Sequence, residues 1–481
     1  MPEGYETVVG LEVHCELATA TKLFCGCPNV FGAEPNTNIC PVCLGLPGSL
    51  PVLNRRAVEL AMRIGTALGC EIRPSVFHRK NYFYPDMPKD YQISQYDEPV
   101  NVNGRLELPD GSVVGIERAH IEEDTGKTTH VGATGRIHGA SHSLVDYNRA
   151  GVPLVETVSA PDIRSAEQAR AYVIELRGVL VATGASDGRM EEGSLRVDAN
   201  ISVRPTGSDI LGTRCEVKNL NSLRSLVRAI EYEARRQVEL LEAGGAVTQE
   251  TRHWDEDAGV THPLRSKEEA YDYRYFQEPD LVPLVPDAAL LEAATAGEAL
   301  LPSDRRRRIA EVFAAHGAEA SAEQVLTVIE LDLDQLVLDA VEVGADARLA
   351  LARAANEAAA RPDDARRLDP RAFADLVKME HDGKLSATQS KTVLGALLEE
   401  GGDPADIAAR LGYEALDTAE LEAAVDRVIA ESPDEWTRYV GGDAKVTGYF
   451  VGKVMQATKG RADGKVVSSV LAARRDEAAG R

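Results

Sequence analysis

The sequence lacks any long apolar segment. Over its 481 residues, no hydrophobic run approaches the roughly 20 residues that a membrane-spanning helix needs. The N-terminus, Met-Pro-Glu-Gly-Tyr, also lacks the basic stretch followed by an apolar stretch that is typical of a secretory signal. These absences favour a cytoplasmic protein that does not associate with a membrane.

The sequence also lacks an excess of positively charged residues. It holds 53 Lys and Arg against 77 Asp and Glu, which gives a formal net charge of -24. Because binding to a polyanion requires Lys and Arg against phosphates, this balance argues against bulk binding of nucleic acid. The net charge is a sum over the whole chain, however, so a local basic patch can still bind RNA.

Cysteine is scarce, and its number is odd. Seven cysteines in a chain of this length argue against a disulfide framework. Four of them cluster in one short segment, as Cys25-x-Cys27 followed, after a loop, by Cys40-x-x-Cys43. Two close pairs separated by a loop are typical of a structural zinc site with four thiolate ligands. The first pair is tighter than the usual zinc-ribbon spacing, so a weakly loaded site or four unrelated buried thiols stay possible. No role is assigned to two of the others, Cys15 and Cys70.

Hydrophobic spacing over 1–293 alternates between strand-like and helix-like. Strands mixed with helices, without a regular βαβ rhythm, predict an α+β domain with a largely antiparallel sheet. A further strand candidate is weak because Gly115 interrupts it. The strand candidates are 7–14, 195–203 and 113–114, and the helical stretches are 54–68 and 163–183.

Composition changes near Pro283–Pro286. Beyond this point Ala, Leu, Glu and Arg dominate, and helical spacing is almost continuous. A breaker cluster, Gly401–Pro404, marks a second boundary. We therefore predict domains at 1–293, 294–404 and 405–481, the last two all-α.

The segment Gly10–Leu17 (GLEVHCEL) predicts a strand with two different faces. Because side chains alternate along a strand, Glu12, His14 and Glu16 share one face and the apolar side chains share the other. Like charges this close repel one another unless a cation or a proton intervenes. A divalent-metal or catalytic face explains the pattern, and so does a solvated sheet face.

A second acidic segment is Ile121–His130 (IEEDTGKTTH). A hard cation such as Mg2+ prefers carboxylate oxygens and shares them with phosphates. A solvated acidic turn is the alternative interpretation. The segment lacks the spaced glycines of a P-loop, so that motif is excluded.

Basic, aromatic and amide side chains gather in His78–Asp86 and Lys89–Gln95. Such groups can hold a phosphate and a stacked base or ribose, although aromatic packing at a domain edge explains them equally well. The polar segments Arg196–Asn200 and Glu216–Ser222 indicate a wet cleft rather than a plain surface.

Seven segments stand out as an ordered set: GLEVHCE (10–16), RKNYFYPDMPKDYQISQ (79–95), EEDTGK (122–127), DYNRAGVPLVE (146–156), MEEGSLRVDAN (190–200), EVKNLNS (216–222) and DYRYFQEPDL (272–281). Each is modest alone, but together they resemble the GatB/GatE family of amidotransferase subunits. The tail around Gly448–Gly460 resembles the YqeY-like region of that family. The length, without a large inserted domain, resembles GatB rather than GatE.

The resemblance implies a cradle-like catalytic domain, an all-α linker domain and an all-α YqeY-like tail that touches tRNA. It implies a heterotrimer, GatCAB, with an amidase (the A subunit), which releases ammonia from glutamine, and a small C subunit. This chain would use ATP and Mg2+ to phosphorylate the side-chain carboxylate of Glu-tRNA(Gln) and/or Asp-tRNA(Asn). Ammonia would then displace phosphate, giving Gln-tRNA(Gln) or Asn-tRNA(Asn), which is the work of a carbon–nitrogen ligase in protein biosynthesis.

Motif positions suggest roles for individual residues. The catalytic and Mg2+-binding residues would be Glu12, His14, Glu123 and Glu156. Alternative or more distant ligands would be Glu16, Glu122 and Asp124. Contacts to substrate or phosphate would come from Arg79, Lys80, Lys89, Arg196, Asp198, Lys218 and Asn219. The ammonia channel would be lined by Thr125, Lys127 and His130. A basic patch for the tRNA would include Lys453, Lys459 and Arg461.

Two other functions are compatible with parts of the sequence. A non-catalytic adaptor would bind tRNA through the tail and use the acidic cleft only structurally. A free-standing zinc enzyme would need an open coordination position, which four thiolates do not leave. Many members of the family lack the four cysteines, so zinc would not be required for the activity.

Overall fold

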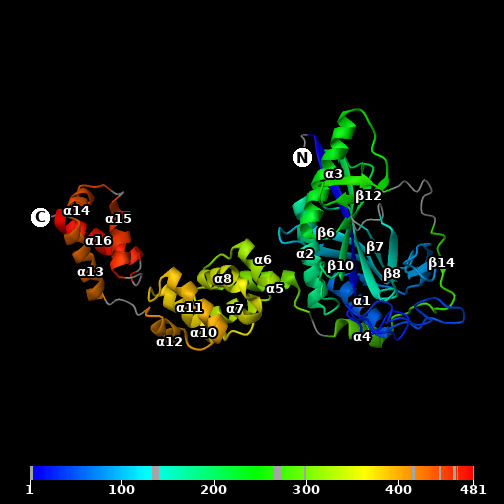
Figure 1. The fold of residues 1–481 in the computed structure, drawn as a ribbon, viewed down its shortest axis with the longest axis horizontal. Coiled ribbons are helices and arrows are strands. Elements are labelled where there is room, and N and C mark those ends of the chain that lie inside the picture. Colours follow the sequence, from blue (N-terminus) through cyan, green and yellow to red (C-terminus); the bar gives the residue numbers. More distant parts are fainter. Residues whose placement is uncertain are drawn as a thin grey trace. The chain divides into compact units, whose positions relative to one another are not determined.

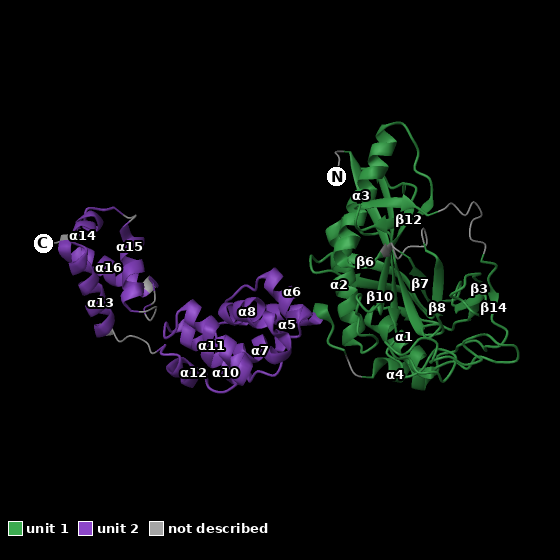
Figure 2. Cartoon of the chain, in the orientation of Figure 1, with its two compact units in different colours: residues 1–303 green, residues 304–481 purple. Residues whose placement is uncertain are grey.

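The computed structural model describes residues 4–132, 140–264, 273–296, 299–413, 418–443, 446–458, 462 and 464–479. The chain forms two compact units, Met1–Ser303 and Asp304–Arg481 (Figure 2). Within the described ranges, no helix is both long enough and apolar enough to cross a membrane.

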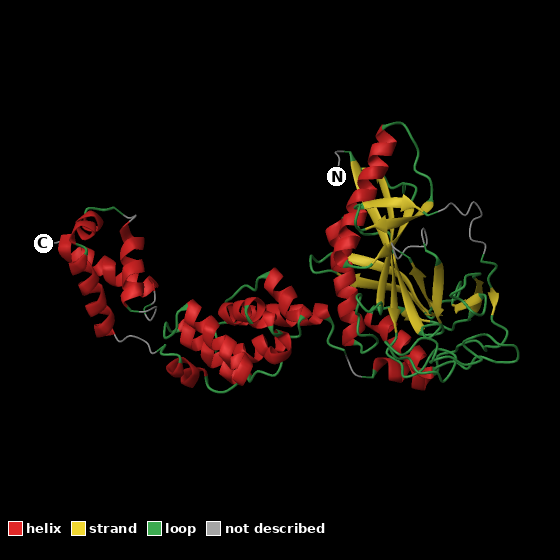
Figure 3. Cartoon of the chain, in the orientation of Figure 1, coloured by secondary structure: helices red, strands yellow, loops and turns green. Residues whose placement is uncertain are grey.

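The first unit is built on a nine-stranded sheet (Figures 1 and 3). Its strand order is β13-β12-β11-β10-β1-β9-β6-β5-β2, and every neighbouring pair is antiparallel except β11 and β12. This confirms the α+β prediction with a largely antiparallel sheet. The strands are β1 (Tyr5–Glu16), β2 (Glu71–Ile72), β5 (Asn101–Glu107), β6 (Val113–Glu123), β9 (Pro153–Ser159), β10 (Leu195–Pro205), β11 (Cys215–Leu220), β12 (Glu250–Asp255) and β13 (Val260–Pro263).

Two small sheets accompany the large one. One has the order β14-β3-β4, and the other pairs β7 with β8. The first of them brings distant segments together, because β14 is the last strand of the unit and pairs with β3, near its start. The strands of these sheets are β3 (His78–Asn81), β4 (Tyr91–Ser94), β7 (Lys127–Val131), β8 (His142–Asp146) and β14 (Phe276–Gln277).

Strand β6 is much longer than the weak candidate at 113–114. It runs through Gly115 to Glu123. Gly115 is accommodated because its N–H donates to Asp162 Oδ2 at 2.9 Å, and a Cβ there would lie only 3.1 Å from that oxygen. The glycine thus marks a close approach of two segments and does not end the strand.

Helices α2 and α3 lie along the large sheet (Figure 1), and the buried side chains of α1, α2, α3 and the sheet form one core. Helix α2 begins after Ser165, whose side chain accepts from the Gln168 N–H, and α3 begins after Ser222, which accepts from the Ser225 N–H. The helices of this unit are α1 (Arg55–Ala67), α2 (Ala166–Ala182), α3 (Leu223–Glu242) and α4 (Ala288–Thr295).

Beyond Asp304, every element in the described ranges is a helix, as predicted (Figure 3). Buried side chains form two separate cores, one from Ile309 to Ala408 and one from Leu421 to Leu471. The predicted boundaries at 293 and 404 stay predictions. The helices are α5 (Pro302–Ala315), α6 (Ala322–Glu330), α7 (Asp334–Glu342), α8 (Ala347–Asn356), η1 (Ala358–Ala360), α9 (Pro362–Ala365), α10 (Pro370–His381), α11 (Ala387–Glu400), α12 (Pro404–Arg410), α13 (Thr418–Glu431), α14 (Pro433–Val440), α15 (Thr447–Ala457) and α16 (Gly464–Ala479).

Candidate functional site

The two faces of β1 differ, as the alternation of polar and apolar residues along the strand requires. Leu11 and Val13 are 0% and 1% exposed and belong to the core. Glu12, His14 and Glu16 are half-buried and lie on the other face. This polar face is the floor of the candidate site.

Three neighbouring strands place one polar residue each in a row across this face. His14 on β1 pairs with Glu156 on β9, and Glu156 pairs in turn with His120 on β6. His120 Nε2 lies 3.4 Å from Glu156 Oε2, and His14 Nδ1 lies 3.1 Å from Glu122 Oε1. The acidic row, which we define as His14, His120, Glu122 and Glu156, is therefore assembled by strand pairing.

Two groups of side chains on this face could each hold a metal ion. Ligand atoms of His14, Glu122 and Glu156 all lie within 4.8 Å of one another, and so do those of Glu12, His14 and Asp198. Carboxylate oxygens suit hard divalent cations, and an imidazole nitrogen is a common additional ligand. The donor set therefore fits a divalent cation, and both groups share His14.

Burial and charge set the protonation of the acidic row. Burial opposes the charged imidazole, but the hydrogen bond to Glu122 and the charge of Glu156 raise the pKa of His14 to about 9. Burial likewise opposes the charged form of Glu122, but the hydrogen bond and charge of His14 lower its pKa to about 2. Burial and the charge of Glu156 raise the pKa of Glu12. Carboxylates this close are stabilised by a cation among them.

Glu123 does not face the acidic row. Its Oε1 accepts hydrogen bonds from Lys89 Nζ and, at 2.8 Å, from the N–H of Ile93. Consecutive residues of a strand point to opposite faces, so Glu122 lies beside His14 and Glu123 lies on the other side of β6. The structure thus groups Glu122, and not Glu123, with the other expected Mg2+ ligands.

Arg79 and Lys80 have different surroundings. The Arg79 guanidinium donates to both carboxylate oxygens of Glu278, at 2.6 and 2.8 Å, and so ties the segment after β14 to β3. Lys80 Nζ lies 4.7 Å from the centre of the Tyr273 ring. Burial opposes its charged form, but the charge of Glu122 raises the pKa of Lys80. Of the two, Lys80 has the charge directed at the acidic row.

Arg196 and Lys218 are both engaged by carboxylates. Arg196 donates to the two oxygens of Asp124 at 3.1 and 2.8 Å. Lys218 Nζ lies 3.3 Å from Asp198 Oδ2 and 2.9 Å from Glu216 Oε1. Lys218 therefore already supplies a positive charge beside the group that contains Asp198.

The other predicted positions are less directly connected to the acidic row. Thr125 is half-buried, whereas Lys127 is exposed on β7 and His130 Nδ1 lies 2.8 Å from Ser143 Oγ. Lys453 is exposed on α15. Two predicted residues and the side chain of a third lie outside the described residues: Lys459, Arg461 and Asn219.

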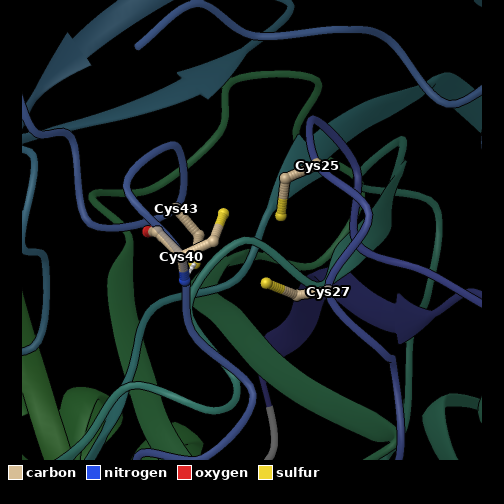
Figure 4. A group of neighbouring side chains, drawn as sticks. All are labelled: Cys25, Cys27, Cys40 and Cys43. Carbon is tan, nitrogen blue, oxygen red and sulfur yellow. Dashed lines mark hydrogen bonds between the residues drawn. The ribbon is translucent and has the colours of Figure 1, made fainter.

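The four cysteines of the predicted zinc motif converge, as Figure 4 shows, and we call them the thiol cluster. The sulfurs of Cys25, Cys27, Cys40 and Cys43 all lie within 4.8 Å of one another. Four ligands placed tetrahedrally at about 2.3 Å from zinc would lie about 3.8 Å apart, so the set fits such an ion. A hydrogen bond from Cys25 lowers the pKa of Cys43 to about 5, which favours the thiolate that a metal needs.

Sequence reasoning missed two residues, His120 and Lys22. His120 is two residues before Glu122, so strand alternation would have placed both on one face had β6 been predicted at full length. Lys22 is fully buried, with Nζ 3.7 Å from Cys43 Sγ and 3.2 Å from the Tyr147 carbonyl oxygen. No local sequence pattern predicts that Lys22 is buried beside the thiol cluster.

The chain is thus an α+β protein in which one face of the large sheet is lined by carboxylates and imidazoles. This face is a candidate metal-dependent site. Residues 7–292 match the family model described as the GatB/GatE catalytic domain, and residues 339–474 match a GatB domain. The chain belongs to the GatB/GatE family.

Similar proteins span nearly the same length. A Mycobacterium protein (strain KMS) is 51% identical, and the match covers 98% of this chain and 96% of the relative. A Nocardia farcinica protein is 50% identical over the same shares, and a Frankia casuarinae protein is 51% identical over 97% and 95%. Each is named as the B subunit of an aspartyl/glutamyl-tRNA(Asn/Gln) amidotransferase.

Proposed function

We propose that this chain is the component of a glutamine-dependent aminoacyl-tRNA amidotransferase that activates the side-chain carboxylate of Glu-tRNA(Gln) and/or Asp-tRNA(Asn). The names of the similar proteins support this reaction. The observation that carries it is the convergence of His14, Glu122 and Glu156 within 4.8 Å on one sheet face.

The chemistry explains why such a site is needed. A carboxylate is a poor electrophile, so one of its oxygens first attacks the γ-phosphorus of ATP, the bond to the bridging oxygen breaks, and ADP leaves. Ammonia then attacks the acyl carbon, the carbon–oxygen bond breaks, and phosphate leaves with the electron pair while the nitrogen loses a proton. Phosphoryl transfer of this kind depends on positioning and on compensation of negative charge.

The residues of the acidic row would hold Mg2+. His14, Glu122 and Glu156 form one candidate group, and Glu12 and Asp198 form the adjacent one together with His14. A bound Mg2+ would offset the charge of the transferred phosphoryl group. This assignment replaces Glu123 by Glu122 in the set expected from the sequence.

Two lysines would supply fixed positive charge at the same face. The charge of Glu122 raises the pKa of Lys80, and the charges of Asp198 and Glu216 raise that of Lys218, in both cases against the effect of burial. Both ammonium groups therefore stay protonated at neutral pH. They would orient phosphate oxygens as point charges.

The thiol cluster would hold a structural zinc ion. Four thiolates leave no ligand position for water or substrate, so the ion would stabilise the loops that carry Cys25–Cys27 and Cys40–Cys43. Its removal would then affect folding more than chemistry.

The remaining expectations concern partners. The chain would assemble with an amidase (the A subunit) and a small C subunit. Ammonia would arrive past Thr125, Lys127 and His130. The tail would contact the tRNA backbone through its basic residues, including Lys453, Lys459 and Arg461.

The proposal is tested by phosphate release from the assembled complex. The complex is supplied with ATP, glutamine and mischarged tRNA, and phosphate and amidated tRNA are measured together. One phosphate per amide, absent with correctly charged tRNA, is expected. Binding of mischarged tRNA without phosphate release would instead establish the adaptor function.

A further inference from the structure

A lysine side chain is buried beside the thiol cluster without a carboxylate partner. Lys22 is 0% exposed, and its Nζ lies 3.7 Å from Cys43 Sγ and 3.2 Å from the carbonyl oxygen of Tyr147. Within the described ranges, no Asp or Glu oxygen lies within 4.0 Å of this nitrogen. Lysine is almost never fully buried unless it is paired, so the ammonium group of Lys22 needs an anion other than a carboxylate.

The thiol cluster can supply that anion. Its four sulfurs converge (Figure 4), and all lie within 4.8 Å of one another. A zinc ion brings two positive charges and four thiolates bring four negative ones, so the loaded cluster would carry an excess of two negative charges. Burying such an excess without a counter-ion is costly. One ammonium group beside the cluster would halve it.

The sulfur of Cys43 accepts hydrogen bonds from two different kinds of donor. The backbone N–H of Cys40 donates to Cys43 Sγ at 3.2 Å, and the ammonium group of Lys22 donates to the same atom at 3.7 Å. Partners that bond to a ligand from outside orient it and adjust its charge. Only one of these two donors, the ammonium group, also brings a positive charge.

The backbone fixes the place of this lysine. The N–H of Lys22 donates to the Cys27 carbonyl oxygen at 3.0 Å, and the N–H of Leu23 donates to the Gly151 carbonyl oxygen at 2.9 Å. A Cβ on Gly151 would lie 3.6 Å from both Lys22 Cδ and Cys43 Cβ, so the aliphatic part of the lysine runs close to the second cysteine pair. Lys22 thus starts at one pair of cysteines and reaches the other.

We propose that Lys22 is part of the metal site, as the counter-ion of the Cys43 thiolate, and that it strengthens the binding of a divalent cation that prefers thiolates. The inference rests on the proposed role of the thiol cluster as a structural zinc site. Lys22 would not contact the ion itself. It acts through Cys43, so it is a positioning residue whose loss should weaken metal binding.

A purely structural role for Lys22 predicts a different outcome. In that case the side chain would only tie the chain to the Tyr147 carbonyl oxygen. This oxygen also accepts the Ala150 N–H at 3.1 Å, so it keeps a donor when Lys22 is replaced. Loss of a purely structural contact would lower the Tm of the metal-free and the zinc-loaded protein alike and leave the Kd for zinc unchanged.

The test measures zinc binding to the full chain by competition with a chelator of known affinity. Lys22→Met keeps the length of the side chain but removes its charge and its donors. The Kd for zinc should rise about 10–100-fold, as is usual when a partner of a metal ligand is removed. The increase in Tm that zinc produces should shrink accordingly.

A matched control removes a different buried lysine near the same sulfurs. Lys89 and Cys43 line one recess, but Lys89 is paired with Glu123. The double variant Glu123→Leu with Lys89→Met therefore removes a buried lysine together with its own carboxylate, and it should bind zinc as the wild type does. A loss of affinity in this control equal to that in Lys22→Met would assign the effect to packing and overturn the proposal.

Cobalt(II) reports on the sulfur itself. Bound to four thiolates, this ion absorbs light by charge transfer from sulfur, and a positive charge beside Cys43 raises the energy of the transition. Lys22→Met should therefore shift the charge-transfer band to longer wavelength, whereas loss of a packing contact would leave the band in place.

A second variant keeps the test decisive if Lys22→Met does not fold. Lys22→Gln retains an N–H donor but no charge, and it should also lose affinity for zinc. Wild-type affinity in the folded variants, with the cobalt band unmoved, would overturn the role of Lys22 while leaving the proposed zinc site intact. A wild-type chain that takes up no zinc would overturn both.

Discussion

Glu122 and Glu123 are adjacent in the chain, but their side chains lie on opposite faces of β6. Glu122 Oε1 lies 3.1 Å from His14 Nδ1 in the acidic row, and Glu123 is paired with Lys89 on the other side. Lys89 also lines, with Cys43 and Glu123, the recess next to the thiol cluster. One carboxylate is thus available for a cation, while the other joins the end of β6 to Lys89 and to Ile93 of β4.

The buried Glu123–Lys89 pair should be important for stability. Their side chains are 2% and 7% exposed, so Glu123→Gln leaves an ammonium group buried without its partner. We expect a loss of about 3–5 kcal/mol in the free energy of unfolding of the first unit, measured by urea denaturation. The double variant Glu123→Leu with Lys89→Met should recover most of it. A loss below about 1 kcal/mol in Glu123→Gln would contradict this role.

The His14–Glu122 pair predicts a defined pH dependence. The folded pKa of His14 is raised from 6.5 to about 9, so its stabilising contribution is complete below pH 6.5 and is lost as the pH rises through 9. The folded pKa of Glu122 is lowered from 4.5 to about 2, so its contribution is complete above pH 4.5 and is lost as the pH falls through 2.

Histidine NMR in the presence of a chelator measures this titration directly. The His14 resonance should titrate with a midpoint near 9. Glu122→Gln should shift the midpoint down towards the ordinary histidine value. A wild-type midpoint near 6.5, unchanged by the variant, would rule out the pair.

The thiol cluster should control stability and not chemistry. Cys40→Ser with Cys43→Ser should abolish stoichiometric zinc binding and lower the Tm of the first unit by about 3 °C, equivalent to about 2 kcal/mol for a unit of this size. Metal content, Tm and turnover at a permissive temperature are the measurements. Cys70→Ser is a control outside the cluster. Complete loss of turnover in a well-folded double variant would contradict a structural role.

Tyr172 offers a test of the core. Its side chain is fully buried on α2, and its hydroxyl has no hydrogen-bond partner among the described residues. Removing that hydroxyl relieves a desolvated polar group, so Tyr172→Phe should be neutral or stabilising by up to about 1 kcal/mol. Thermal denaturation measures the difference. A loss of more than about 1 kcal/mol would mean that the hydroxyl has a bonding partner.

Local patterns predicted the elements whose signals are contained in one segment. The period of two in β1 separated Glu12 and His14 from the core, and the cysteine spacing predicted the thiol cluster. The same reasoning underestimated β6, because Gly115 is disfavoured inside a strand unless another segment comes close, as the Asp162 carboxylate does here.

The acidic row could not be predicted in full because strand pairing assembles it. His14, His120 and Glu156 come from three strands that are far apart in the chain, and only the register β1–β9–β6 aligns them. Which of Glu122 and Glu123 faces the acidic row depends on the pairing register of β6, since a shift of one residue would exchange the faces on which they lie. The residue types indicated a metal site, but the residues that belong to it could be identified only from the fold.

The most direct test of the account is phosphate release by the complete complex carrying Glu122→Gln, with mischarged tRNA, ATP and Mg2+. The control is Glu192→Gln, which changes a half-buried carboxylate paired with Arg189. The account predicts that Glu122→Gln lowers release about 100-fold or more, while glutamine hydrolysis and the control variant are unaffected. Phosphate release at the wild-type rate in Glu122→Gln would contradict it.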